Sequence, residues 1–441
     1  MEVKGRQLFQ LLVPLMVEQL LNSFMGTADT VMITKCGSAA ISAVSLVDSI
    51  NVMIVLIFSA MATGGAILCS QYLGRKDIKQ ACHAGKQLIL SVTFVSIVGT
   101  AILILFKKSI LSLIFGSVEA EVMSKSEIYF FITALSYPFI AIYNSGAAIF
   151  RADGNSKLPM VVSTISNILN IVGNAIFIFG FNMSVAGAAL STLISRIFCA
   201  VVILILLNRT KQQIAIDSYL AKPDFREISQ ILRIGIPSGI ENGMFQFGKL
   251  AIQSSVSTLG TAAIAANALT SVLESFSSQA PIGIGIALMT LAGQAYGAGN
   301  YKLAEKYIKK LTFFSFIAVA ISSVIVIGIV KPLTVLSGMD ADVALLTIQL
   351  SVFVHVIKPF AWSFSFIPPY GMRATGDVRF PMLVSTVTMW TCRVALTIFL
   401  IRVLKTGPLG VWIGMSSDWV IRSVIFFFRF KSGKYIHRTA V

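Results

Sequence analysis

The feature that most constrains the fold of this chain is a fifteen-residue segment that occurs twice. The segment FRADGNSKLPMVVST, residues 150–164, recurs as MRATGDVRFPMLVST, residues 372–386, with eight identical positions. Further matches at nearly the same spacing are Pro14 with Pro237, Glu18 with Glu241, Gly37 with Gly260, Gln71 with Gln294, Gly74 with Gly297, and Gly187 with Gly410. A repeat at a fixed offset indicates duplication of a structural unit. We therefore interpret the chain as two copies of one unit.

The composition indicates a protein that crosses a membrane many times. Of the 441 residues, 56% are hydrophobic and 12% are charged, whereas roughly a quarter of the residues of a soluble domain are charged. Apolar runs of about 20 residues recur throughout the chain, and each is long enough to cross a hydrocarbon core of about 30 Å. Open strands cannot pair their backbone groups in lipid, so the runs are expected to be helices. The predicted fold class is an all-α polytopic membrane protein.

Twelve spans are predicted from the apolar runs. They lie at about residues 8–33, 44–71, 86–106, 127–149, 159–180, 184–207, 232–256, 264–294, 311–330, 343–370, 378–402 and 408–430. Six spans fall in each half, so both copies enter the membrane from the same side, as in parallel repeats related by a pseudo-twofold axis along the membrane normal. The predicted domains are an N-terminal six-helix lobe (1–207), a cytoplasmic interlobe linker (208–231) and a C-terminal six-helix lobe with a short basic tail (232–441). A cavity is expected between the lobes.

The Lys and Arg residues predict the orientation, because segments rich in these residues stay in the cytoplasm. With both termini inside, most of the 35 basic residues fall in cytoplasmic segments. Two matching clusters are Arg75, Lys76, Lys79 and Lys86 in the first half and Lys302, Lys306, Lys309 and Lys310 in the second. Such clusters contact lipid headgroups, so the net charge of +16 predicts contact with the bilayer and argues against nucleic acid. We expect a multi-pass protein of the inner (plasma) membrane.

Asp29, near the outer end of the first predicted span, is the leading candidate for chemistry in the first half. An ionisable side chain at membrane depth costs several kcal/mol and is a functional candidate by default. A buried carboxylate without a countercharge tends to take up a proton near neutral pH, which is the property that a coupling group needs. The alternative is an interfacial aspartate that is simply hydrated.

Uncharged oxygen donors follow in the fifth and sixth spans. Asn167, Asn170 and Asn174 recur at helical spacing, and Thr192 lies in the next span. Amides on one stripe also hold helices together, with about 1 kcal/mol per bond in bilayers, so a structural role stays open. The predicted oxygen-lined cation or proton site consists of Asp29, Tyr129, Asn144, Asn170, Asn174 and Thr192.

The second half carries more charge within its predicted spans. The predicted substrate-cavity or charge network consists of Glu241, Lys249, Glu274, His355 and Lys358; Arg393 and Asp418 also lie in spans. Opposite signs on neighbouring helices predict ion pairs that face water or protein rather than lipid. Glu18 and Glu241 each follow a proline by four residues, so hydrogen bonding around a helix kink is their alternative role.

An enzyme is not expected. The glycine-rich stretch PIGIGIAL, residues 281–288, lies inside a predicted span and fits close helix packing. The histidines and the five cysteines are dispersed, and the spacing favours neither a metal cluster nor a disulfide framework. We expect no cofactor, and no metal beyond Na⁺ at Asp29.

Several motifs together resemble the multidrug and toxic compound extrusion (MATE) family over nearly the whole chain. They are PLMVEQLLNSFMGTADTVMI, CGSAAISAVSL, SQYLGRKDIKQA, FRADGNSKLP, AGQAYGAGNYKLAEK and MRATGDVRFP. The resemblance implies a twelve-helix, two-lobe antiporter of the inner membrane that exports amphipathic, often cationic compounds as sodium ions or protons enter. It also implies that the family's first-lobe cation site falls on the oxygen-lined set around Asp29.

Two positions depart from the family pattern. The branch with the first-lobe site often has a second aspartate where this chain has Asn174, which leaves one carboxylate at that site. Another branch joins a glutamate similar to Glu241 to an aspartate at the position of Trp362, so a complete second-lobe sodium site is not expected.

The sequence thus predicts a secondary antiporter of amphipathic drugs or metabolites that is driven by H⁺ or Na⁺, works by alternating access and acts as a monomer. The alternative is a flippase for a lipid-linked saccharide or another amphipathic lipid of the same superfamily. Such a protein is expected to have a more basic cavity and often additional spans.

Overall fold

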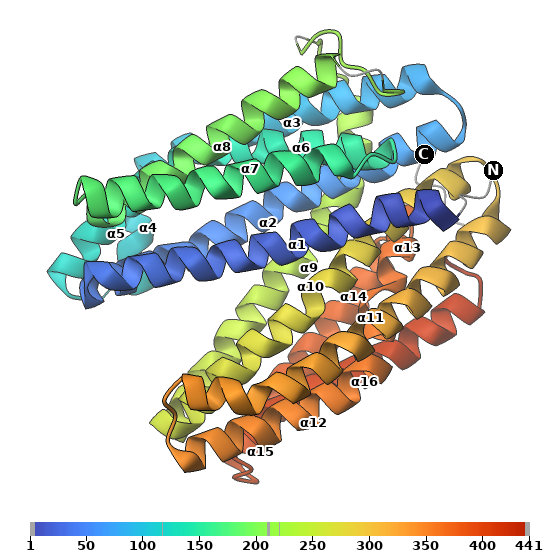
Figure 1. The fold of residues 1–441 in the computed structure, drawn as a ribbon. Coiled ribbons are helices and arrows are strands. Elements are labelled where there is room, and N and C mark those ends of the chain that lie inside the picture. Colours follow the sequence, from blue (N-terminus) through green and yellow to red (C-terminus); the bar gives the residue numbers. More distant parts are fainter. Residues whose placement is uncertain (1–4, 117, 210–211, 220, 437–441) are drawn as a thin grey trace. The chain divides into compact units, whose positions relative to one another are not determined.

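The computed structural model describes residues 5–116, 118–209, 212–219 and 221–436 (Figure 1). Within these ranges the regular structure is helical throughout, as predicted. The chain divides into two compact units: the N-terminal unit ends at Gly239 and the C-terminal unit begins at Ile240. The division lies inside a helix, whereas the predicted lobes meet in the linker at 208–231.

Within the described ranges, the N-terminal unit contains eight complete α-helices and the start of a ninth. The complete helices are α1 (Gly5–Ile33), α2 (Ser38–Gly74), α3 (Ile78–Leu105), α4 (Lys107–Phe115), α5 (Ala120–Leu135), α6 (Tyr137–Ala152), α7 (Lys157–Asn174) and α8 (Ser184–Arg209), with a π-helical segment, Ala175–Gly180, after α7. Helix α2 packs against α3, α5 and α6, and α7 packs against α1 and α8. These contacts hold the ends of α1, α2, α5, α7 and α8 around one polar region.

The C-terminal unit repeats this order. It contains the greater part of α9 (Phe225–Val256), followed by α10 (Thr261–Gly297), α11 (Tyr301–Leu336), α12 (Ala341–Phe366), α13 (Pro368–Ala374), α14 (Arg379–Thr388), a π-helical segment (Met389–Ala395), α15 (Leu396–Arg402) and α16 (Leu409–Lys431). Helix α12 packs against α10, α11 and α16.

Local geometry confirms that the two halves repeat each other. Gly37 and Gly260 each follow a short 3₁₀ turn with φ of 91° and 89°, a left-handed conformation that favours glycine. The side chains of Asp77 and Asn300 cap α3 and α11 by accepting bonds from the backbone N–H three residues later. The same turn and the same cap therefore recur in both halves.

The helices differ from the predicted spans at two places. The fourth predicted span, 127–149, is broken into α5 and α6 with a bend of 41°, because Pro138 lies in the first turn of α6 and cannot donate a backbone bond across the junction. Helix α9 begins at Phe225, inside the predicted linker, because Asp224 accepts bonds from the N–H groups of Arg226 and Glu227 and starts the helix there.

Ten helices in the described ranges are long and apolar enough to cross a membrane, or eleven when the bent α5–α6 pair counts as one span. Helix α9, the seventh predicted span, is not among them. Its 32 residues include Arg233, Glu241 and Lys249, which lower its apolar character. The structure thus supports a multi-pass helical protein.

The segment before α9 is attached to α3. Gln87 Nε2 donates to the Lys222 carbonyl at 2.9 Å and Gln87 Oε1 accepts from Asp224 N at 3.0 Å. The bond from His83 Nε2 at 3.0 Å holds the pKa of the exposed Asp224 carboxyl below its usual range. Gln213 N donates to Asp153 Oδ2 at 3.2 Å, and burial raises the pKa of Asp153 to about 6. The segment is therefore fixed to its own unit.

Candidate functional site

The N-terminal unit encloses a polar cavity of about 630 Å³. Five helices contribute its lining: α1, α2, α5, α7 and α8. The polar lining residues are Asp29, Thr30, Ser45, Asp48, Asn51, Tyr129, Thr133, Asn174, Thr192 and Arg196. Apolar side chains such as Val44 and Leu56 complete the wall. The cavity thus combines two carboxylates, one guanidinium and several uncharged oxygens in an apolar surround.

Asp29 lies where α1 packs on α7. Its Oδ1 accepts a bond from Asn174 Nδ2 at 2.6 Å. Asn170 and Asn174 are one helical turn apart, so both amides face α1. The Asn170 amide fits its neighbours best with its nitrogen donating to Asp29 Oδ1 at 2.9 Å and its oxygen accepting from Thr192 Oγ1 at 3.2 Å. The predicted carboxylate and amides therefore do meet.

A second carboxylate in this cavity was missed by the sequence reasoning. Asp48 of α2 accepts bonds from Asn51 Nδ2 at 2.9 Å and from Tyr129 OH at 3.1 Å. The cavity as a whole therefore contains two carboxylates, and α2 supplies the one that was not among the predicted site residues. The signal was present in the sequence, since Asp48 is a charged residue inside the second predicted span.

Arg196 of α8 was missed as well. It lines the same cavity, and its Nη1 donates to Ser136 Oγ at 2.7 Å, at the break between α5 and α6. In a medium of low dielectric, a guanidinium that shares a cavity with two carboxylates compensates part of their charge. Arg196 too is a charged residue within a predicted span, so the same signal could have found it.

The remaining predicted residues of the first half differ in whether they line the cavity. Tyr129 and Thr192 line the cavity, as proposed from the sequence. Asn144, half-buried on α6, is not among the described residues that line it. Asn174 Oδ1 is buried and has no hydrogen-bond partner within the described part of the chain. This oxygen is free to face a cation.

In the C-terminal unit, Lys358 and Glu274 form an ion pair with 2.8 Å between Nζ and Oε1. The fully buried ammonium also donates to the Ser277 and Ser278 hydroxyls, at 2.5 and 2.8 Å. His355 Nε2 lies 3.2 Å from Ser277 Oγ. Three of the five predicted second-half residues thus form one cluster on α10 and α12.

Glu241 belongs to a different contact. Its Oε2 pairs with Arg373 Nη2 at 2.6 Å, and the first half has the same contact between Glu18 Oε1 and Arg151 Nη2 at 2.7 Å. Both arginines belong to the repeated fifteen-residue motif, where they follow its first residue. The alternative role of the two glutamates was hydrogen bonding around a helix kink. The structure instead shows an equivalent ion pair in each half, which joins α1 to α6 and α9 to α13.

Lys249 lies apart from the acids. Its ammonium is 5.1 Å from the centroid of the Phe245 ring, and the Arg393 guanidinium lies 4.9 Å from the same centroid. Two cations thus share one aromatic ring, an arrangement in which the ring attracts each of them.

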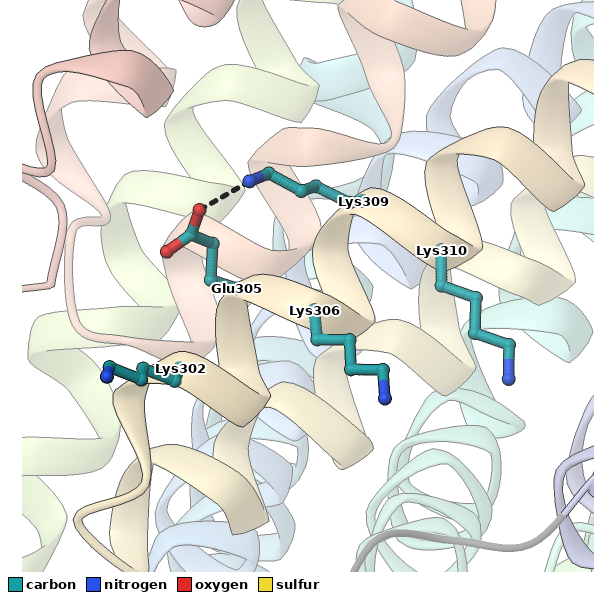
Figure 2. A pocket seen from close by; sticks show the side chains of 5 residues that line it. All are labelled: Lys302, Glu305, Lys306, Lys309 and Lys310. Carbon is teal, nitrogen blue, oxygen red and sulfur yellow. Dashed lines mark hydrogen bonds and ion pairs between the residues drawn. The ribbon is translucent and has the colours of Figure 1, made fainter.

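The predicted basic cluster of the second half lies on the first turns of α11 (Figure 2). Lys309 Nζ pairs with Glu305 Oε1 at 2.6 Å, one turn earlier on the helix. The lysines that the figure labels are Lys302, Lys306, Lys309 and Lys310. The position fits an interfacial segment that contacts lipid headgroups.

A duplicated set of long apolar helices, with carboxylates and amides lining a cavity in one half, defines the class: a multi-pass helical membrane protein with an internal repeat. The sequence model of the MatE family matches the chain twice, at residues 14–176 and 237–399. The chain belongs to the MatE family, and the resemblance found in its motifs is thereby confirmed.

Known proteins agree with this assignment. The chain is 26% identical to a probable multidrug resistance protein NorM of Thermotoga maritima, over 99% of this chain and 94% of that protein. It is also 26% identical to a probable multidrug resistance protein YoeA of Bacillus subtilis, over 96% of this chain and 92% of that protein. A crystal structure of MATE in complex with MaL6 superimposes with a TM-score of 0.89 at 18% identity, covering 97% of this chain and 95% of that one. The fold of the chain is the fold of that structure.

Proposed function

We propose that the chain is a secondary antiporter that exports amphipathic compounds in exchange for H⁺ or Na⁺. The observation that carries the proposal is the contact between Asp29 and Asn174, which holds a carboxylate on α1 against an amide on α7 in the wall of a partly open cavity. A carboxylate in such a place is costly unless it binds a proton or a cation. The multidrug resistance relatives support export as the direction of transport.

The cavity offers the chemistry of either coupling ion. Asp29, Asp48, Asn174 Oδ1 and the Tyr129 hydroxyl supply oxygen atoms, which are the ligands that hard cations prefer. A proton on Asp29 would serve the same purpose by removing its charge. In either case coupling requires that Asp29 bind the ion with different affinity in two states of the transporter.

The remaining finer features belong to the same proposal. We infer that α9 is the additional span that completes twelve, since 32 residues are long enough to cross a bilayer and both halves begin with a proline-containing helix. The protein then works by alternating access of the substrate site. The protein acts as a monomer in the inner (plasma) membrane, with both termini in the cytoplasm.

Export from proteoliposomes tests the coupling group. Ethidium is loaded, and its export is followed under a sodium gradient and, separately, under a pH gradient. We expect Asp29→Asn to lower ion-driven export about tenfold or more, within the range of typical coupling energies, and Asp48→Asn to lower it less. The gradient that drives wild-type export identifies the ion.

A matched control is Glu121→Gln, which removes an exposed carboxylate from the start of α5 and leaves the cavity unchanged. It is expected to export at the wild-type rate. Ion-driven export by Asp29→Asn at the wild-type rate would overturn the assignment of the coupling group. Movement of a labelled lipid without any export of ethidium would favour the flippase instead.

A further inference from the structure

The intramembrane charges of the C-terminal unit do not balance. The cluster around α9, α10, α12, the π-helical segment and α16 contains four cationic side chains and two carboxylates. Its members are Lys249, Lys358, Arg393 and Arg422 on one side and Glu274 and Asp418 on the other.

Both carboxylates of the cluster already have a cation. Glu274 is paired with Lys358 at 2.8 Å. Both oxygens of Asp418 accept bonds from Arg422 Nη2 at 2.9 Å, whereas Arg393 Nη1 approaches Asp418 only to 4.0 Å. Arg393 therefore shares Asp418 with Arg422, which is closer to it.

The other described carboxylates of this unit lie elsewhere. Glu241 is paired with Arg373, Asp377 with Arg429 and Glu305 with Lys309. Asp340 and Asp342 are exposed at the start of α12. The cluster's positive excess thus falls on Arg393 and Lys249.

Arg393 and Lys249 meet at the Phe245 ring. Arg393 is 7% exposed, and its Nη1 has no hydrogen-bond partner among the described residues, while Nη2 contacts the Met415 sulfur. Lys249 is exposed on α9, one helical turn after Phe245. An exposed lysine, a guanidinium with an unpaired nitrogen and an aromatic ring therefore lie together.

An oxyanion would complete this arrangement. A buried donor without a partner costs free energy, and a charge-assisted bond to a carboxylate, sulfonate or phosphate would recover it. The adjoining ring and alkyl side chains would contact the apolar part of the same molecule. A cationic compound, by contrast, would meet two like charges here.

We propose that Lys249, Arg393 and Phe245 form a binding site for the anionic group of an amphipathic substrate. The inference rests on the proposed export function and narrows its substrate class: the substrates include aromatic compounds that carry a negatively charged oxyanion, alone or in a zwitterion. Lys249 contacts the oxyanion from the exposed side and Arg393 from the buried side.

Two dyes that differ only at the relevant group test the site. Rhodamine B carries a free carboxylate, and rhodamine B ethyl ester has the same ring system without that negative charge. Their binding to the detergent-solubilised full-length protein is measured by fluorescence anisotropy. We expect the wild type to bind rhodamine B about tenfold more tightly than the ester, a difference of ~1.4 kcal/mol.

Substitutions then test whether the preference for rhodamine B over its ester arises at the proposed anion site. Lys249→Gln is expected to weaken rhodamine B binding about tenfold and to leave ester binding unchanged or slightly stronger, and Lys249→Arg should retain the preference. The matched control is Lys107→Gln, because Lys107 stacks on Phe131 at 5.1 Å in the other unit and should affect neither dye. Arg393→Gln should act as Lys249→Gln does.

The outcomes separate this inference from the export proposal. Equal binding of acid and ester by the wild type, or equal weakening of both by Lys249→Gln, overturns the anion site while ion-driven ethidium export can persist. Loss of coupling in Asp29→Asn together with an intact preference for rhodamine B supports both proposals independently. Selective binding of rhodamine B without ion-driven export of any dye would retain the site and refute the antiporter.

Discussion

The two halves share a scaffold, but a charged residue in one half corresponds to an uncharged residue in the other. The N-terminal half holds two carboxylates in its cavity, and the C-terminal half has uncharged residues at the corresponding positions. Conversely, a glycine that lines the N-terminal cavity corresponds to a lysine. The matched positions, all 223 residues apart, are Asp29 with Ile252, Asp48 with Ser271, and Gly26 with Lys249.

One contact between side chains also occupies matched positions in the two halves, and the two copies of this contact differ in strength. In the first half Tyr137 OH donates to Asn51 Oδ1 at 2.6 Å, and in the second half Lys358 pairs with Glu274. Tyr137 and Lys358 each precede a Pro-Phe pair, and Asn51 and Glu274 are equivalent in the repeat. A neutral bond in one copy is thus an ion pair in the other. The scaffold sets where polar groups meet, and each copy sets which charges it places there.

The largest expected effects come from the ion pair that both halves have kept. Arg151→Met leaves Glu18 buried without its cation, and Arg373→Met does the same to Glu241. Each loss is expected to destabilise the protein by about 3–5 kcal/mol. The first should be larger, because Glu18 is 2% exposed and Glu241 is 14% exposed.

Thermal unfolding in detergent measures this difference. The double variants Glu18→Gln with Arg151→Met and Glu241→Gln with Arg373→Met are the controls, since they remove both charges and should regain most of the stability. An equal loss in single and double variants would show that packing, rather than charge, makes the contact important.

A smaller contrast in stability is expected between the Lys358–Glu274 ion pair and the Tyr137–Asn51 hydrogen bond. Glu274→Gln leaves the fully buried Lys358 without its carboxylate and should cost about 3 kcal/mol, whereas Tyr137→Phe removes one neutral bond and should cost about 1 kcal/mol. Unfolding of the two variants under one condition makes the comparison. Lys358→Met combined with Glu274→Gln should recover stability; equal costs for the two single variants would contradict the assignment of an ion pair.

The smallest effect is a pH dependence confined to the first half. Burial raises the pKa of Asp153 to about 6, so the folded chain favours the neutral acid; the associated stability is present below the unfolded value and is lost as the pH rises through about 6. Asp153 aligns with Thr375, which cannot titrate there. The difference in melting temperature between wild type and Asp153→Asn should therefore change between pH 5 and pH 7. A constant difference would contradict this role, and Thr375→Val is the control for the second half.

Sequence reasoning reached the family, the helical class and the duplication, because all three depend on composition and on long matched segments. It also placed Asp29 with Asn170 and Asn174, since helical spacing puts these amides on one face. It missed Asp48 and Arg196, although both are charged residues within predicted spans.

Other features required the structure because they depend on packing between distant segments. The break at Ser136 and the early start of α9 arise from local bonds that hydropathy does not register. The partner of Glu241 is 132 residues away, and a proline four residues before it suggested a nearer explanation. The contact between Glu241 and Arg373 shows that the repeated fifteen-residue motif packs against the first helix of its own half.

The same contact has a consequence for synthesis. Glu18 leaves the ribosome 133 residues before Arg151, and Glu241 leaves it 132 residues before Arg373. At typical elongation rates of about 5–20 residues per second, each interval lasts roughly 7 to 27 seconds. During that time the glutamate of each leading helix lacks its partner arginine, so each ion pair can form only after most of its own half has been synthesised.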